Sequence, residues 1–204
     1  MLFSDTYKTI SAPAEAIYKE KASKFLAFAY PVTNENEIRE QLTALRKVHF
    51  SANHHCYAWI LGFDKSAYRI NDDGEPGGTA GRPIHGQLLS FDLTNILVVV
   101  VRYFGGTKLG VSGLINAYKT ATADALQNAL IEERIVYDYY ALKFPYETIN
   151  QVMKLVKDEN LTINSPVFDT ECSLEVAIRR SRSESLVERL KKINNVSPLY
   201  VKTV

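Results

Sequence analysis

The chain has 204 residues, of which 46% are hydrophobic and 23% charged, a balance typical of a folded globular protein and not of a disordered, fibrous or disulfide-rich one. Since 24 Lys and Arg residues oppose 23 Asp and Glu residues, a nucleic-acid or membrane partner would have to be bound by a local patch. Two cysteines occur, no secretory signal pattern opens the chain, and the longest apolar run covers six residues, so we expect a cytoplasmic protein without a membrane span.

Hydrophobic spacing predicts an alternation of strands and helices in the first two thirds of the chain. In chain order, the predicted elements are strands at 7–12, 14–21 and 25–32, a helix at 34–48, a strand at 55–63, a loop at 71–86, a short helix near 87–91 and a strand at 96–104. The loop prediction rests on five glycines and two prolines in sixteen residues. A glycine-rich turn then leads into a helix that we expect to extend to about residue 134, with Leu130 on its inner side.

After residue 137 the chain holds no glycine, and a second pattern begins. The predicted order is strand 139–146, helix 147–159, strands 161–168 and 171–179, helix 182–193 and strand 198–202. This βαββαβ order is the ferredoxin-like arrangement. We therefore expect a mixed α/β protein of the α+β kind with two domains, residues 1–137 and 138–204.

The strand at 96–104 and the glycines after it have the layout of a phosphate-binding turn, although they complete neither a Walker A nor a dinucleotide-binding motif. No acidic residue occurs in the 31 residues between Asp92 and Asp124, so this stretch has a local charge of +3. The candidate anion-binding residues are Arg102, Lys108, Lys119, Gly105, Gly106, Gly110 and Gly113. The alternative is that the glycines only form a tight turn and allow close packing.

An acidic loop precedes this region and contains Asp72, Asp73, Glu75 and Thr79. Its carboxylates could hold Mg²⁺ beside a phosphate, act as general acid and base, or simply form turns. Arg102 stands at the end of an otherwise apolar strand, where it would either contact a phosphate or form an ion pair with one of these carboxylates.

A His54-His55-Cys56 triplet lies on a predicted strand. Zinc needs three or four ligands, and no second pair such as C-x-x-C occurs, so no metal is assigned. A Cys56 nucleophile with His55 as its base is disfavoured because adjacent strand positions face opposite sides. Near the end of a later strand, Arg179, Arg180 and Arg182 form a basic cluster, which is typical of solvated surface and less often of RNA or acidic-protein binding.

Taken together, these motifs resemble the YigZ/IMPACT family. The matching text is HHCYAW at 54–59, DDGEP at 72–76, GTAG at 78–81 with Pro83, VVVRYFGG at 99–106, and then Leu109-Gly110, Gly113-Leu114 and Ala117-Tyr118. One departure is Ser112, where the family usually has a second glycine beside Gly113.

The resemblance implies a first domain similar to the second domain of ribosomal protein S5 and to domain IV of elongation factor G, and a tail similar to that factor's C-terminal domain. It also implies a role in translation, because eukaryotic relatives are translation regulators that compete for the scaffold of a starvation-responsive kinase. We therefore expect a binding protein for RNA, the ribosome or a translation-associated protein, without a cofactor. The alternative is a metal-dependent hydrolase or phosphate-handling enzyme that uses the Asp72, Asp73 and Glu75 loop.

Overall fold

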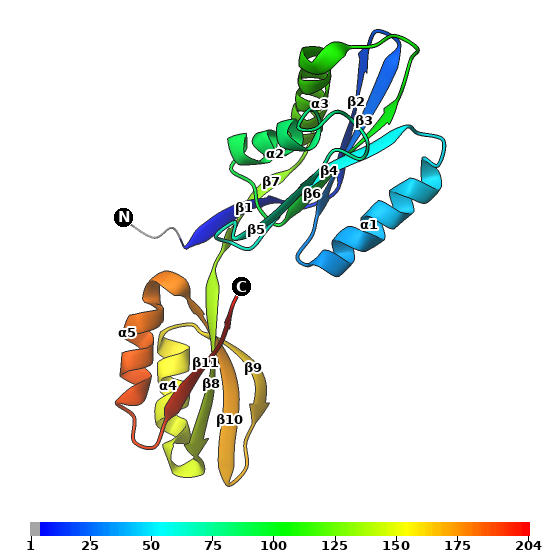
Figure 1. The fold of residues 1–204 in the computed structure, drawn as a ribbon. Helices are drawn as coiled ribbons and strands as arrows, with labels where there is room; N and C mark the ends of the chain where they lie inside the picture. Colours follow the sequence, from blue (N-terminus) through cyan, green and yellow to red (C-terminus); the bar gives the residue numbers. More distant parts are fainter. Residues whose placement is uncertain (1–4) are drawn as a thin grey trace. The chain divides into compact units, whose positions relative to one another are not determined.

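The computed structural model describes residues 5–204, which form two compact units (Figure 1). The first unit comprises Tyr7–Arg134, and the second comprises residues 135–204 together with Asp5 and Thr6. Within the described residues, no helix combines the length and the hydrophobicity that crossing a membrane requires.

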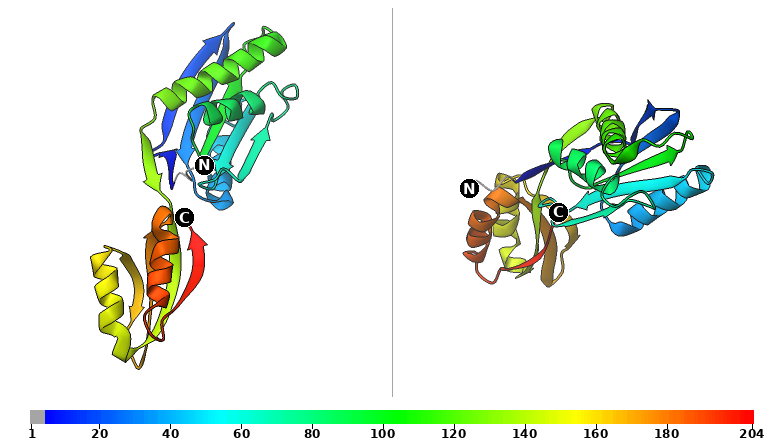
Figure 2. Two further views of the ribbon diagram at one scale, coloured as in Figure 1. Left: turned by 90° about the vertical axis from the view of Figure 1, so that its left-hand side faces the viewer. Right: turned by 45° about the horizontal axis from the view of Figure 1, so that its top comes forward.

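The first unit is built on a five-stranded antiparallel sheet with the strand order β2-β3-β6-β4-β5. Helices α2 and α3 cover one face of this sheet and α1 covers the other (Figures 1 and 2). The elements are β1 (Thr6–Ile10), β2 (Ala14–Glu20), β3 (Ser23–Pro31), α1 (Glu35–Val48), β4 (His54–Leu61), β5 (Ala67–Asn71), α2 (Gly81–Ser90), β6 (Ile96–Tyr103), α3 (Gly110–Gln127) and β7 (Ile131–Ile135).

Strand β6 is the central strand of this sheet, as its β-branched run predicts. Successive side chains alternate between the two faces, so Val98 and Val100 pack under α2 and α3, whereas Val99 and Val101 pack under α1. The same alternation turns Arg102 toward the α3 face. There it shares one row across the sheet with Phe25 of β3 and His54 of β4.

The second unit is a four-stranded antiparallel sheet with the strand order β11-β8-β10-β9 and both helices on one face. Its elements are β8 (Tyr137–Pro145), the 3₁₀ turn η1 (Tyr146–Thr148), α4 (Ile149–Asp158), β9 (Thr162–Val167), β10 (Glu171–Arg179), α5 (Arg180–Lys191) and β11 (Ser197–Thr203). Both the element order and the strand order are ferredoxin-like, so the predicted fold of this part is confirmed.

Three details of the first unit differ from the sequence prediction. Helix α2 begins at Gly81, inside the segment predicted to be a loop through residue 86, because the Asp72 carboxylate accepts hydrogen bonds from the N–H groups of Ala80 and Gly81. Helix α3 ends at Gln127 and not near residue 134, since residues 131–135 form β7, which pairs with β1. Leu130 is consequently 72% exposed. Strand β5 was not predicted.

Candidate functional site

A cavity of about 470 Å³ opens on the α3 side of the first unit. The loop before α2 and the turn between β6 and α3 meet there, at the end of the sheet row that carries Arg102 and His54. The lining residues are Asn53, His54, Glu75, Pro76, Arg102, Phe104, Lys108, Leu109, Gly110, Val111 and Leu114. The structure therefore brings the acidic loop and the glycine-rich turn together.

A buried ion pair forms the floor of this cavity. The Arg102 guanidinium donates to Glu75 Oε1 at 2.6 Å, and both side chains are buried. Tyr118 on α3 donates its hydroxyl proton to the same oxygen at 2.8 Å. Arg102 also lies against the rings of Phe25 and Phe104, at 5.4 and 5.5 Å from their centres. Of the two roles that the sequence left open for Arg102, the structure shows the ion pair.

The Cys56 thiol lies beneath the same network. Its sulfur is 3.0 Å from the Asp72 carbonyl oxygen and 3.3 Å from the Tyr118 hydroxyl. Burial raises the pKa of Cys56 to about 12, so the thiol is protonated at neutral pH and is a poor nucleophile. Burial, and secondarily the neighbouring Cys56 and Glu75, also raise the pKa of Tyr118, which keeps its hydroxyl as a donor.

The three carboxylates of the acidic loop have separate partners. Asp72 accepts hydrogen bonds from three backbone N–H groups, those of Gly78, Ala80 and Gly81, at 2.8 to 3.1 Å. Burial alone would raise the pKa of Asp72, but these N–H groups outweigh it and hold the pKa below its ordinary value. Asp72 therefore satisfies N–H groups at the start of α2, whereas Thr79 closes the turn before the helix by donating its hydroxyl proton to the Pro76 carbonyl oxygen.

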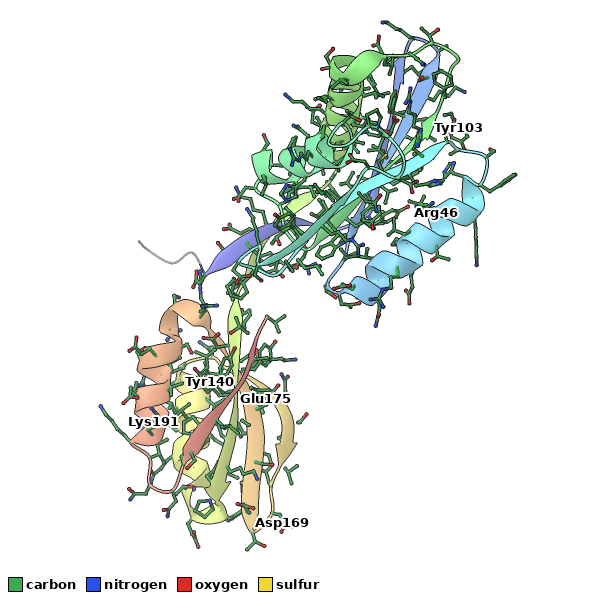
Figure 3. The ribbon with its side chains drawn as sticks, in the orientation of Figure 1. Arg46, Tyr103, Tyr140, Asp169, Glu175 and Lys191 are labelled. Carbon is green, nitrogen blue, oxygen red and sulfur yellow. The ribbon has the colours of Figure 1, made fainter. Side chains whose placement is uncertain are left out.

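Asp73 fastens the loop to β4 and α1. One of its oxygens accepts from the His55 N–H at 2.6 Å, and the other pairs with Arg46 at 2.9 Å. Figure 3 labels Arg46 on α1. Burial raises the pKa of Asp73, yet the bonds to Arg46 and His55 bring it below the ordinary value. Among residues 5–204, no three His, Cys, Asp or Glu side chains are grouped so that they could hold a metal ion. Asp72 and Asp73 are thus engaged by backbone and side-chain donors of the protein itself.

The two adjacent histidines face opposite sides of β4, as predicted. His54 lines the cavity, donates from Nδ1 to the Asp73 carbonyl oxygen at 2.8 Å, and places Nε2 3.9 Å from Glu75 Oε1. His55 faces α1, where burial and then the Arg46 charge lower its pKa. Since Cys56 shares the His54 face, His55 cannot act as its base.

The glycines of the turn have different roles. A side chain at Gly105 would meet the backbone of Ala22 at 2.1 Å, so this glycine is required for close packing. Gly110, with a φ of 74°, opens α3 and lines the cavity. Gly106 faces open space, and a side chain at Gly113 would meet Leu109 at 3.1 Å. Close packing therefore explains why residue 105 is a glycine. Of the four glycines of the turn, Gly105, Gly106, Gly110 and Gly113, Gly110 is the one that lines the cavity.

Of the three cations that the sequence places in this region, Arg102, Lys108 and Lys119, fewer contribute a free positive charge to the cavity than predicted. Lys108 lines the rim and is exposed, and no acidic side chain of the described part of the chain lies within ion-pair distance of it. Lys119 is exposed on α3 but does not line the cavity. Helix α3 starts with no side-chain cap and no acidic residue in its first turn, so its N-terminal N–H groups add to the positive potential near Lys108.

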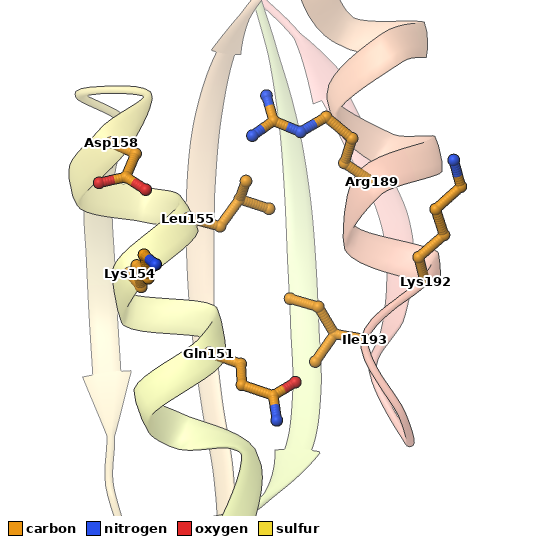
Figure 4. Close-up of a pocket in the computed structure, with 7 residues that line it drawn as sticks. All are labelled: Gln151, Lys154, Leu155, Asp158, Arg189, Lys192 and Ile193. Carbon is orange, nitrogen blue, oxygen red and sulfur yellow. The ribbon is translucent and has the colours of Figure 1, made fainter.

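In the second unit, two members of the predicted basic cluster, Arg179 and Arg182, pair with acidic side chains. Arg179 binds Asp5 through two hydrogen bonds, of 2.5 and 3.0 Å, and Arg182 pairs with Glu159. Arg189 pairs with the same glutamate. A second concavity, of about 400 Å³, lies between α4 and α5, and Figure 4 shows Arg189 extending into it. Its lining residues are Gln151, Lys154, Leu155, Asp158, Arg189, Lys192 and Ile193.

Sequence reasoning missed several residues of the first cavity. Tyr118, which bonds Glu75 beneath the cavity, was named only within the Ala117-Tyr118 match to the family, and this bond depends on packing that spacing alone does not reveal. Phe104 and Val111 are 44% and 60% exposed, and large apolar residues on either side of a glycine-rich turn were the available signal.

Residues 21–126 match the family model of the Impact N-terminal domain, and this range includes the whole cavity. The chain belongs to the IMPACT family. It is 27% identical to IMPACT family member YvyE of Bacillus subtilis over 93% of this chain and 88% of that protein, and 32% identical to IMPACT family member YigZ of Escherichia coli over 72% of each. A crystal structure of a hypothetical protein superposes with a TM-score of 0.75 at 26% identity, covering 98% of this chain and 99% of that one.

Proposed function

We propose that this IMPACT family member is a translation-associated regulatory protein and that the cavity of the first unit contacts RNA of the translation machinery. The observation that carries the proposal is the rim of this cavity. There, an unpaired cation at Lys108 and the uncapped start of α3 lie beside exposed apolar side chains of the turn. The position of the cavity inside the family domain and the resemblance to translation regulators support it.

The chemistry of the floor favours binding over catalysis. Arg102 balances the charge of Glu75, Tyr118 donates a hydrogen bond to the same oxygen, and the Cys56 thiol is held protonated. Asp72 and Asp73 are engaged by backbone N–H groups. None of these groups is placed as a free base or an activated nucleophile. The buried charges at the floor of the cavity are paired, and the unpaired positive charge lies at its rim. A surface that binds a polyanion requires this arrangement.

Co-sedimentation with purified ribosomes tests the proposal. The full-length protein should pellet with ribosomes at low salt and be released as the salt concentration rises, because phosphate contacts release counterions. Lys108→Ala should weaken pelleting. Lys119→Ala is the matched control, since it removes an exposed lysine of α3 that lies outside the cavity, and it should pellet like the wild type.

Two results would contradict the proposal. One is a wild-type protein that does not pellet at low salt. The other is pelleting that neither salt nor Lys108→Ala changes, which would indicate an apolar protein partner or a contact through the second unit. A double Lys154→Ala and Lys192→Ala variant of the groove in Figure 4 reports on that second route.

A further inference from the structure

The cavity of the first unit has two chemically different parts, and a simple anion would use only one of them. The cationic part consists of Lys108 and the N-terminal turn of α3, which begins at Gly110. The apolar part consists of Pro76, Phe104, Leu109, Val111 and Leu114. Inorganic phosphate would leave the apolar walls in water, and a purely apolar ligand would leave Lys108 without a partner.

Phe104 is presented as a stacking surface. Its ring is 44% exposed, and the Arg102 guanidinium lies 5.5 Å from the ring centre. Its backbone is fixed because Asn53 Oδ1 accepts the Phe104 N–H at 2.8 Å, and Asn53 itself lines the cavity. An aromatic ring held in place beside a cation is the arrangement on which proteins stack single-stranded bases.

The floor can hydrogen-bond the edge of a polar ring. Arg102 is buried, and Glu75 and the two flanking rings hold its guanidinium in place at the floor of the cavity. His54 donates from Nδ1 to the Asp73 carbonyl oxygen, which leaves its Nε2, 3.9 Å from Glu75 Oε1, to meet the edge of a ring in the cavity.

We infer that the cavity binds one nucleotide, with its base against Phe104 and its phosphate at Lys108 and the start of α3. A volume of about 470 Å³ suits one nucleotide and is too small for a stacked duplex. This inference rests on the proposed function, according to which the nucleotide is an unstacked residue of an RNA chain. A free nucleoside monophosphate has the same chemistry, and the experiment separates the two sources.

The test measures binding of two probes, adenosine 5′-monophosphate and a ten-nucleotide single-stranded RNA, by calorimetry or fluorescence anisotropy with the full-length protein. Phe104→Ala should weaken RNA binding by about 5-fold to 100-fold, the loss expected for one base stack. Phe104→Trp should restore it, whereas Phe104→Leu, which keeps an apolar side chain, should not. Lys108→Ala should reduce the salt slope of RNA binding by about 0.7, as for one phosphate.

The two probes distinguish the source of the nucleotide. Monophosphate binding that depends on Phe104 shows that free nucleotides occupy the site, and RNA binding that depends on Phe104 without monophosphate binding assigns the site to the polymer. Both outcomes support the inference. The inference is overturned if neither probe binds, or if Phe104→Ala and Lys108→Ala bind both probes as the wild type does.

Failure of the inference and failure of the proposed function give different results. If ribosomes retain the wild type in a way that depends on salt and on Lys108, but neither probe binds the protein, the translation role stands and the nucleotide site does not. If the monophosphate binds through Phe104 but ribosomes do not retain the wild type, the site stands and the translation role does not. Phe104 is partly exposed, so its replacement should leave the fold intact. Fluorescence of the single tryptophan, Trp59, verifies that each variant is folded.

Discussion

The ion pair between Arg102 and Glu75 should contribute strongly to the stability of the first unit. The two side chains are 6% and 3% exposed and meet at 2.6 Å. Replacing Arg102 by Met keeps an apolar stem between the rings of Phe25 and Phe104 but leaves the Glu75 charge with the Tyr118 hydroxyl and, 3.9 Å away, His54. Removing one partner of a buried pair costs about 3–5 kcal/mol. We expect Arg102→Met to lower the unfolding free energy by that amount.

Urea unfolding followed by Trp59 fluorescence measures this loss. The protein has one tryptophan, which lies on β4 and is 7% exposed, so its signal reports the first unit. A Glu75→Gln and Arg102→Met double variant removes both charges. It should be more stable than the sum of the two single losses implies, with a coupling of about 2–3 kcal/mol. A loss below about 1 kcal/mol for Arg102→Met, or additive losses in the double variant, would refute the reasoning.

Three further predictions follow from the packing around the site. Gly105→Ala should prevent stable folding of the first unit, since the new side chain would meet backbone at 2.1 Å, whereas Gly86→Ala, exposed on α2 with no atom within 4 Å, should stabilise it by about 0.5–1 kcal/mol in urea unfolding. Tyr118→Phe should cost about 1.5–3 kcal/mol in the same assay because it removes a donor to the buried Glu75 carboxylate, and an unchanged midpoint would contradict this bond. Asp72→Asn should cost about 1 kcal/mol at pH 7 by weakening the start of α2. Since the folded pKa of Asp72 is below its ordinary value of 3.8, the stabilisation by its charge is present above that pH and is lost as the pH falls through the folded pKa, so wild type and variant should converge in acid.

The elements that could be predicted are those whose signal is local. Helix α1 begins where Asn34 accepts the N–H groups of two following residues, and its acidic first turn and basic last turn are visible in the sequence. The start of α2 could not be predicted, because the carboxylate that accepts its N–H groups belongs to Asp72, nine residues earlier in the chain. Likewise, β7 is specified by pairing with β1, more than 100 residues away.

The candidate site was predictable as a region but not as a set of contacts. The patterns of charge and glycine indicated that Arg102 could form an ion pair with the acidic loop. They did not indicate which of its three carboxylates is the partner. Two features decide that Arg102 pairs with Glu75. The register between β4 and β6 places Arg102 beside His54, and the turn of the acidic loop places Glu75 over these two residues. The sequence places Phe104 at the end of a predicted apolar strand. That its side chain lines the cavity depends on how the following turn folds, which the sequence pattern does not predict.

Photo-cross-linking of the wild-type protein to ribosomes, followed by mass-spectrometric mapping of the peptides attached to RNA, tests most directly whether the cavity of the first unit contacts RNA. We expect cross-links in residues 104–114, on the rim of the cavity that holds Phe104 and Lys108. Cross-links confined to the groove between α4 and α5 in the second unit, or the absence of any cross-link to RNA at low salt, would contradict it.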